Sequence, residues 1–123
     1  MSNIDETTNF TPKFDANGLI PCITMNVKTG KVAMFAYMNE QSLNKTIQTG
    51  EVHYWSRSRA ELWHKGATSG TVQIVHDIII DCDQDCILIN AEIMGAGTGC
   101  HTGRSSCFYR RITKDGNLEF IEN

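Results

Sequence analysis

The sequence of 123 residues contains no apolar run long enough to cross a membrane and no recognisable export signal. A membrane-spanning helix needs roughly 20 predominantly apolar residues, and no unbroken apolar stretch approaches that length. The N-terminal residues 1–6, MSNIDE, lack the basic region and the apolar segment of a secretory signal. We therefore expect a cytoplasmic protein that has no membrane partner.

Positive charge is also scarce, because the 11 Lys and Arg residues are outnumbered by 14 Asp and Glu residues and the net charge is −3. A nucleic-acid-binding domain normally carries a basic excess, so we expect no nucleic-acid partner, and an anionic ligand must be held by a local group of cations. With 41% apolar and 20% charged residues, the composition is that of a folded domain. We expect one domain over residues 1–123, with the polar residues 1–12 as a flexible terminus.

The spacing of apolar residues predicts a β-rich fold with at least one helix. Residues 19–27 and 31–38 are rich in apolar and β-branched side chains and flank a short turn that ends at Gly30, so they should form a hairpin. Asn39 is a typical helix N-cap, and Gly50 is a typical helix stop. Further strands are predicted at residues 52–56, 72–81, 86–94, 107–112 and 118–121. The predicted class is α+β, with a mostly antiparallel β-sheet and one or more short helices.

Five cysteines in a chain without an export signal indicate reduced thiols. Cys100 lies in a glycine-rich segment, where side-chain packing does not explain a thiol. Together with Cys82 and Cys107 it could supply three thiolates to a zinc ion, which would leave the fourth tetrahedral position for water. The alternative is that these are buried or regulatory thiols. Cys22 and Cys86 lie in apolar stretches and are interpreted as structural.

Asp81, Asp83 and Asp85 alternate along the chain. On a fully extended strand the outer two would lie ~13 Å apart, so the segment must bend if all three are to bind one ion. A turn at residues 83–85 would supply the bend, and carboxylate oxygens suit Mg²⁺. The alternative is an acidic, solvated turn that binds no metal.

A candidate anion site combines Arg57 and Arg59 with the segment 65–70. Guanidinium groups bind phosphate through paired hydrogen bonds. The glycines of this segment would let backbone amides, Lys65 and the Ser69 hydroxyl approach phosphate oxygens. The alternative is an ordinary exposed polar surface.

His101 directly follows Cys100. An imidazole with an ordinary pKa near 6.5 can accept or donate a proton at neutral pH, so we regard His101 as the candidate catalytic base. His53 and His76 fall within predicted strands and are interpreted as core or surface residues.

Several motifs, taken together and in order, resemble one enzyme family. They are GLIP at 18–21, AYMN at 36–39, YWSRSR at 54–59, LW at 62–63 with KG at 65–66, TSG at 68–70, DCDQD at 81–85, and CHTG at 100–103 followed by SCFYR at 106–110. They extend over almost the whole chain, and they closely resemble the phosphoribosyl-AMP cyclohydrolase family of histidine biosynthesis.

The resemblance implies a cyclic amidine hydrolase that opens the adenine ring of phosphoribosyl-AMP between N1 and C6 with a zinc-activated water. It also implies an intertwined homodimer in which both subunits contribute zinc ligands. The residues that map onto the family's metal ligands are Cys82, Cys100 and Cys107 for zinc and Asp81, Asp83 and Asp85 for magnesium. On this basis we expect the substrate phosphates at Arg57, Arg59, Lys65 and Ser69.

The chain departs from the family pattern in three places. Gln84 stands where many relatives have glycine, and the segment 94–99 is slightly longer than usual. We also expect no fused pyrophosphohydrolase domain. The alternative functions are a non-catalytic zinc-containing nucleotide-binding module and a base deaminase, whose His-x-Glu and Pro-Cys-x-x-Cys signatures are missing.

Overall fold

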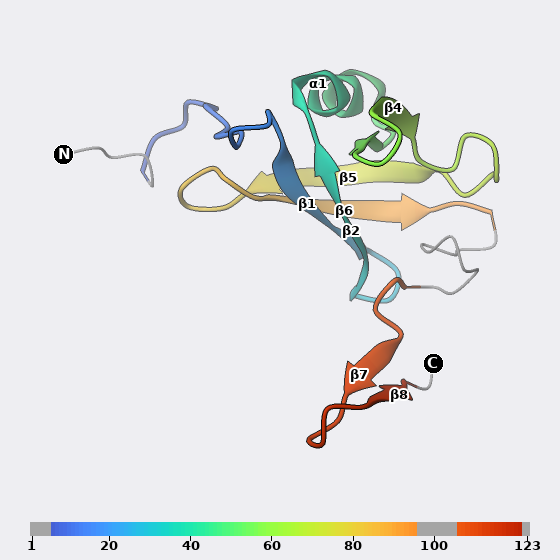
Figure 1. Cartoon of the computed structure of the whole chain (residues 1–123). Coiled ribbons are helices and arrows are strands. Elements are labelled where there is room, and N and C mark those ends of the chain that lie inside the picture. The colour runs from blue at the N-terminus through green and yellow to red at the C-terminus, as the bar shows by residue number, and fades with distance from the viewer. Residues whose placement is uncertain (1–5, 96–105, 122–123) are drawn as a thin grey trace.

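The computed structural model describes residues 6–95 and 106–121 of the chain. This part consists of a six-stranded sheet, a helix and a separate two-stranded hairpin (Figure 1). In chain order the elements are β1 Ile20–Asn26, β2 Lys31–Met38, α1 Glu40–Thr49, β3 His53–Ser56, β4 Glu61–His64, β5 Gln73–Ile80, β6 Ile87–Ile93, β7 Arg110–Ile112 and β8 Leu118–Phe120. The strand order in the large sheet is β4-β3-β2-β1-β6-β5. The predicted α+β class is therefore confirmed.

The large sheet is antiparallel except at one of its inner strand pairs. β1 and β6 run parallel, with Cys22 level with Ile87 and Asn26 level with Ala91. The four other strand pairs of the large sheet are antiparallel, which confirms the mostly antiparallel prediction. Parallel strands need a long connection, and here it contains β2, α1 and three further strands. Local patterns in the sequence do not reveal this pairing.

Helix α1 has the ends that the sequence predicts. The Asn39 side chain accepts a hydrogen bond of 2.8 Å from the amide of Ser42, whose hydroxyl accepts one of 2.9 Å from the amide of Asn39. At the other end Gly50 has a φ of 73°, and its amide donates to the carbonyl of Thr46. The helix has 10 residues and is too short to cross a membrane.

The core lies on one face of the sheet, where alternate residues of β1 and β6 are buried. Its members come from four strands, α1 and Val52: Ile20, Cys22, Met34, Met38, Leu43, Val52, Tyr54, Ile87, Ile89 and Ala91. Burial raises the pKa of the Cys22 thiol to about 12, which fits the structural role predicted for it.

A short chain of polar groups crosses this core. The Tyr54 hydroxyl donates to Oε1 of Gln73 at 2.7 Å, so the Thr24 hydroxyl, 2.6 Å away, must donate to the tyrosine oxygen. The Gln73 amide donates in turn to the sulfur of Met34 at 3.3 Å. These bonds join four strands of the sheet and satisfy groups that would otherwise be buried without partners.

β7 and β8 lie within the strands predicted at residues 107–112 and 118–121, and they pair as an antiparallel hairpin. It stands away from the large sheet in Figure 1 and pairs with none of its strands. Ile112 is 78% exposed and Phe120 is 67% exposed. The hairpin therefore leaves large apolar side chains uncovered in a single chain.

Candidate functional site

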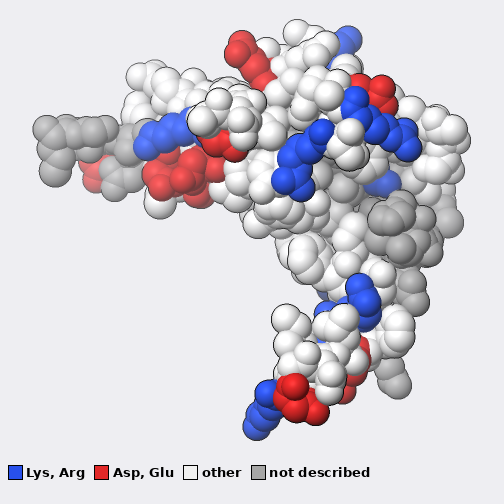
Figure 2. Space-filling model, in the orientation of Figure 1, with Lys and Arg blue, Asp and Glu red and all other residues white. Residues whose placement is uncertain are grey.

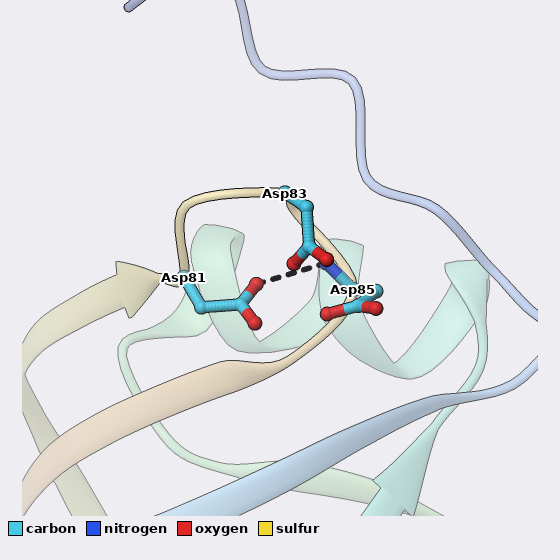
Figure 3. A group of neighbouring side chains, drawn as sticks. All are labelled: Asp81, Asp83 and Asp85. Carbon is cyan, nitrogen blue, oxygen red and sulfur yellow. Dashed lines mark hydrogen bonds between the residues drawn. The ribbon is translucent and has the colours of Figure 1, made fainter. Parts of the chain in front are cut away.

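The three aspartates lie together in the turn between β5 and β6 (Figure 3). One carboxylate oxygen from each of Asp81, Asp83 and Asp85 lies within 4.8 Å of the other two. The amides of Asp85 and Cys86 donate to Oδ1 of Asp81 at 2.9 and 3.1 Å and close the turn. The bend that the spacing of the aspartates required is present.

The carboxylates of this acidic turn, residues 81–85, perturb one another. Hydrogen bonding with Asp83 and then with Asp81 raises the pKa of Asp85 to about 6. Burial raises the pKa of Asp81, but hydrogen bonds with Asp85 and Cys86 outweigh it, and the net pKa of Asp81 is lowered. Hard divalent cations such as Mg²⁺ prefer oxygen ligands, and these three neighbouring carboxylates could supply them.

The two predicted zinc ligands within the described residues do not meet in one chain. Cys82 is exposed in the acidic turn. Cys107 is half-buried beside the start of β2, where its amide donates to the carbonyl of Ala33 at 2.7 Å. From the strand register and a rise of ~3.3 Å per residue, the two cysteines lie on the order of 15 Å apart along the strands. Two sulfurs bound to one zinc at ~2.3 Å each cannot be more than about 5 Å apart.

Two predicted site residues, Cys100 and His101, lie outside the described residues. The neighbouring described positions are fixed by close contacts. A Cβ on Gly95 would lie 2.6 Å from the carbonyl oxygen of Gly70, so Gly95 packs closely against the 65–70 segment. On the other side, the Ser106 hydroxyl donates to the carbonyl of Val32 at 2.6 Å.

Arg57 and Arg59 lie in the loop between β3 and β4. The Arg57 guanidinium carbon lies 4.2 Å from the centroid of the Tyr37 ring, and Arg59 lies 3.9 Å from a carboxylate oxygen of Glu61. Arg59 lines a surface hollow of ≈ 490 Å³, and Arg57 lines a neighbouring hollow of ≈ 320 Å³. In Figure 2 the Lys and Arg side chains gather over the β3–β4 end of the sheet, and acidic side chains gather at the β5–β6 turn.

Lys65 and Ser69 follow β4 but do not line these two hollows. Lys65 is only 6% exposed, and its ammonium nitrogen lies 5.4 Å from the centroid of the Trp63 ring. The Ser69 hydroxyl lies 2.7 Å from that of Thr71. Gly66 has a φ of 82°, and a Cβ there would lie 2.1 Å from the carbonyl carbon of Thr71, so glycine is required for this tight loop. The two arginines therefore share one loop but line different hollows, and Lys65 and Ser69 lie on the loop that follows β4.

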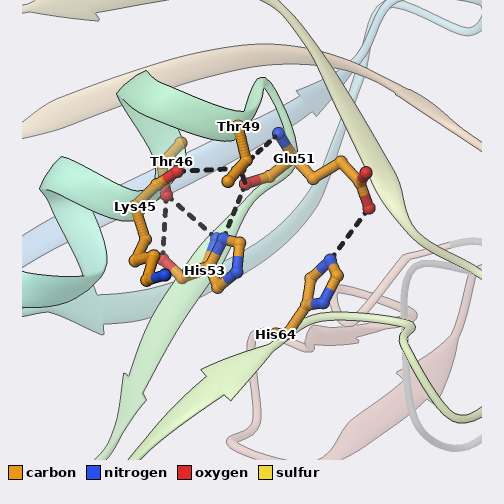
Figure 4. A network of polar contacts seen from close by, with 6 residues as sticks. All are labelled: Lys45, Thr46, Thr49, Glu51, His53 and His64. Carbon is orange, nitrogen blue, oxygen red and sulfur yellow. Dashed lines mark hydrogen bonds and ion pairs between the residues drawn. The ribbon is translucent and has the colours of Figure 1, made fainter.

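Sequence analysis missed a polar cluster at the junction of α1, β3 and β4 (Figure 4). Nε2 of His64 lies 2.9 Å from a carboxylate oxygen of Glu51, and Nδ1 of His53 lies 2.8 Å from the Glu51 carbonyl. The two imidazole rings stack at 4.3 Å between centroids. Burial lowers the pKa of His53 below its usual 6.5, which favours the neutral imidazole. Recognising the β3–β4 hairpin would have revealed this pair, because His53 and His64 are cross-strand partners.

Comparisons with known proteins agree with the motifs. Residues 34–109 match the family model described as phosphoribosyl-AMP cyclohydrolase. A phosphoribosyl-AMP cyclohydrolase of Chelativorans sp. (strain BNC1) is 50% identical over 99% of this chain and 88% of its own length. Proteins with the same name from Rhodopseudomonas palustris (strain BisA53) and Brucella canis are 53% and 48% identical, each over 92% of this chain and over 76% and 81% of their own lengths. The chain belongs to the phosphoribosyl-AMP cyclohydrolase family.

Proposed function

We propose that this chain hydrolyses phosphoribosyl-AMP in histidine biosynthesis, opening the adenine ring between N1 and C6. The observation that carries the proposal is identity of about 50% over nearly the whole chain to proteins named for this activity. The two arginines, together with a cation bound at the acidic turn, would suit a substrate with two phosphate groups, which carries about four negative charges at neutral pH.

The zinc site belongs to two subunits in this proposal. Cys82 of one chain would join Cys100 and Cys107 of its partner, because Cys82 and Cys107 are too far apart within one chain to bind the same ion. Three thiolates leave one tetrahedral position open. When bound there, zinc lowers the pKa of water and so supplies hydroxide near neutral pH.

The β7–β8 hairpin supports a homodimer. Ile112 pairs with Leu118 and Arg110 with Phe120, so the three apolar side chains share one face of the hairpin, and the Arg111–Glu119 ion pair lies on the other. A two-stranded hairpin is marginally stable by itself in water. Packing of its apolar face against a second copy of this chain would stabilise the hairpin and bring the distant thiols of two chains together.

We propose that Mg²⁺ binds at the acidic turn, at a site separate from that of zinc. It would be held by the carboxylates of Asp81, Asp83 and Asp85, whose oxygens already converge within one chain. Bound cation offsets the negative charge of this turn, which otherwise repels an anionic substrate. Arg57 and Arg59 would hold a phosphate group from the β3–β4 loop, and Lys65 and Ser69 would act from the adjoining loop.

His101 is the proposed catalytic base. It directly follows the proposed zinc ligand Cys100 in sequence, and we propose that it accepts a proton from the attacking water. Proton transfer by a positioned imidazole typically contributes 10²–10⁴-fold to a rate, and the ordinary histidine pKa suits this role at neutral pH.

An absorbance assay with phosphoribosyl-AMP tests the activity directly. Protein stripped of metal is assayed alone and after addition of zinc, magnesium or both. Opening of the purine ring changes its ultraviolet absorbance, and we expect this change only when zinc is restored, with magnesium increasing the rate. Zinc binding without any change in substrate absorbance would instead favour a non-catalytic nucleotide-binding module.

A further inference from the structure

We propose that Gln84 is a positioning residue that joins the N-terminal segment 9–13 to the acidic turn. In this inference, docking of the segment and binding of Mg²⁺ at the three aspartates stabilise each other. The inference rests on the magnesium part of the proposed function. We call residues 9–13 the N-terminal strap.

Gln84 makes three hydrogen bonds with the strap. Its side-chain Oε1 accepts from the amide of Thr11 at 2.7 Å, and its side-chain nitrogen donates to the carbonyl of Asn9 at 3.1 Å. Its backbone carbonyl accepts from the amide of Lys13 at 2.7 Å. These bonds reach alternate residues of the strap, as bonds from a neighbouring strand would. The side-chain amide of Gln84 therefore acts as an additional peptide group against which the strap pairs.

The strap has apolar anchors close to these bonds. Phe10 lines an apolar hollow of ≈ 300 Å³ with residues that include Ile47 and Ile79. Phe14, just beyond the strap, packs against the main core. In Figure 3 the N-terminal segment passes beside the acidic turn. Phe14 therefore holds the chain against the core directly after the strap, and the bonds from the strap to Gln84 connect the turn to that position.

The backbone of Gln84 explains why the side chain matters. Its φ is 61°, in the left-handed region that glycine adopts without strain and that a residue with a Cβ adopts at a cost. The turn itself needs only the amide of this residue, which donates to the carbonyl of Asp81 at 3.1 Å. A glutamine here is 4% exposed and makes its side-chain bonds to the strap. The side chain therefore serves the strap rather than the turn.

The position of Gln84 in the chain couples the strap to the metal ligands. Asp83 and Asp85 are its immediate neighbours, so restricting the backbone of Gln84 restricts both carboxylates. Fewer conformations of the empty turn mean a smaller entropy loss when a cation binds. By linkage, bound cation must strengthen docking of the strap by the same factor.

Two variants break the contact from opposite sides. Gln84→Gly keeps the left-handed backbone and removes both side-chain bonds, and Thr11→Pro removes the strap amide without changing the turn. We expect each to weaken Mg²⁺ binding about three- to tenfold, the loss expected for one or two neutral hydrogen bonds, and the double variant to be no weaker than the worse single variant. Ala60→Gly, at another left-handed position, and Thr8→Pro, immediately before the strap, are matched controls that should stay within about twofold of wild type.

Isothermal titration calorimetry with MgCl₂ on the zinc-loaded protein measures the affinity, and hydrogen exchange measures docking of the strap. We expect Mg²⁺ to slow exchange of the Thr11 and Lys13 amides in the wild type, and to have no such effect at Thr11 in Gln84→Gly. A role in stability alone would not make strap exchange depend on Mg²⁺.

The coupling is overturned if both variants bind Mg²⁺ as tightly as the wild type, or if Mg²⁺ does not change hydrogen exchange of the strap amides. Either result leaves the magnesium site itself intact. A wild-type protein that binds no Mg²⁺ overturns the magnesium site and the coupling together. Ring opening by the zinc-loaded enzyme is measured separately, so failure of the hydrolase proposal would be recognised independently.

Discussion

The two candidate metal sites of this chain are built in opposite ways. The three carboxylates come from five consecutive residues, and their oxygens converge within 4.8 Å in a single chain. Cys82 and Cys107 come from distant segments and remain on the order of 15 Å apart. A magnesium site can therefore form as soon as one chain folds. The proposed zinc site, and with it the hydrolytic chemistry, requires a second chain.

The largest expected effect comes from the thiols. Cys107→Ser should remove zinc and lower the rate of ring opening on the order of 10³-fold or more, because water then keeps a high pKa. Zinc content by mass spectrometry and the absorbance assay measure the two losses. Cys22→Ser, at a buried thiol that is not a proposed zinc ligand, is the control and should retain zinc.

Replacing the proposed catalytic base should have a smaller effect and leave the proposed zinc ion in place. His101→Ala should lower turnover roughly 10²-fold while zinc stays bound. His76→Ala, at an exposed histidine of β5, should leave turnover unchanged. Turnover in His101→Ala equal to that of the wild type would remove this residue from the mechanism.

Ile112→Asp tests the proposed difference between the two sites. Burial of one large apolar side chain contributes about 1.5–3 kcal/mol, so a charge in its place should weaken the dimer at least 10- to 100-fold. Analytical ultracentrifugation measures the dissociation. The dissociated chain should lose zinc and keep its Mg²⁺ affinity. A monomer that retained zinc would contradict the shared site.

Replacing Arg59, which lines the larger of the two hollows, should weaken substrate binding more than it slows the chemical step. Arg59→Ala should raise KM about tenfold with little change in kcat, because loss of one charge-assisted hydrogen bond to phosphate is worth about 1.5 kcal/mol in both ground and transition states. Lys28→Ala, which removes a cation paired with Glu92 elsewhere on the surface, controls for net charge. An effect confined to kcat would contradict uniform phosphate binding.

The smallest predicted effect is a change of stability with pH. Burial lowers the pKa of His53 in the folded chain from its usual 6.5, so the unfolded chain binds a proton first as pH falls. Stability from this residue is therefore complete above pH 6.5 and decreases as pH falls toward the folded pKa. Urea unfolding between pH 7 and about 5 should show this slope in the wild type and a smaller slope in His53→Asn. Equal slopes would show that His53 is not held neutral.

Sequence predicted those features whose determinants lie within a few residues. The capped ends of α1, the β1–β2 hairpin and the bend at the aspartates all depend on neighbours in the chain. The parallel pairing of β1 with β6 and the contact between Thr11 and Gln84 join residues more than 60 positions apart, and no local pattern encodes them. The stacking of His53 on His64 was not predicted because Arg57 and Arg59 were interpreted only as an anion site, although residues 57–60 form the turn of a hairpin.

Mixing two inactive variants tests the shared site most directly. Cys82→Ser and Cys107→Ser chains are each purified, unfolded together, refolded with zinc and assayed for ring opening. In a mixed dimer one site loses both cysteines and the other keeps both, so the mixture should recover about one quarter of wild-type activity. If each zinc site lay within one chain, every subunit would still lack a ligand, and the mixture would remain as inactive as the separate variants.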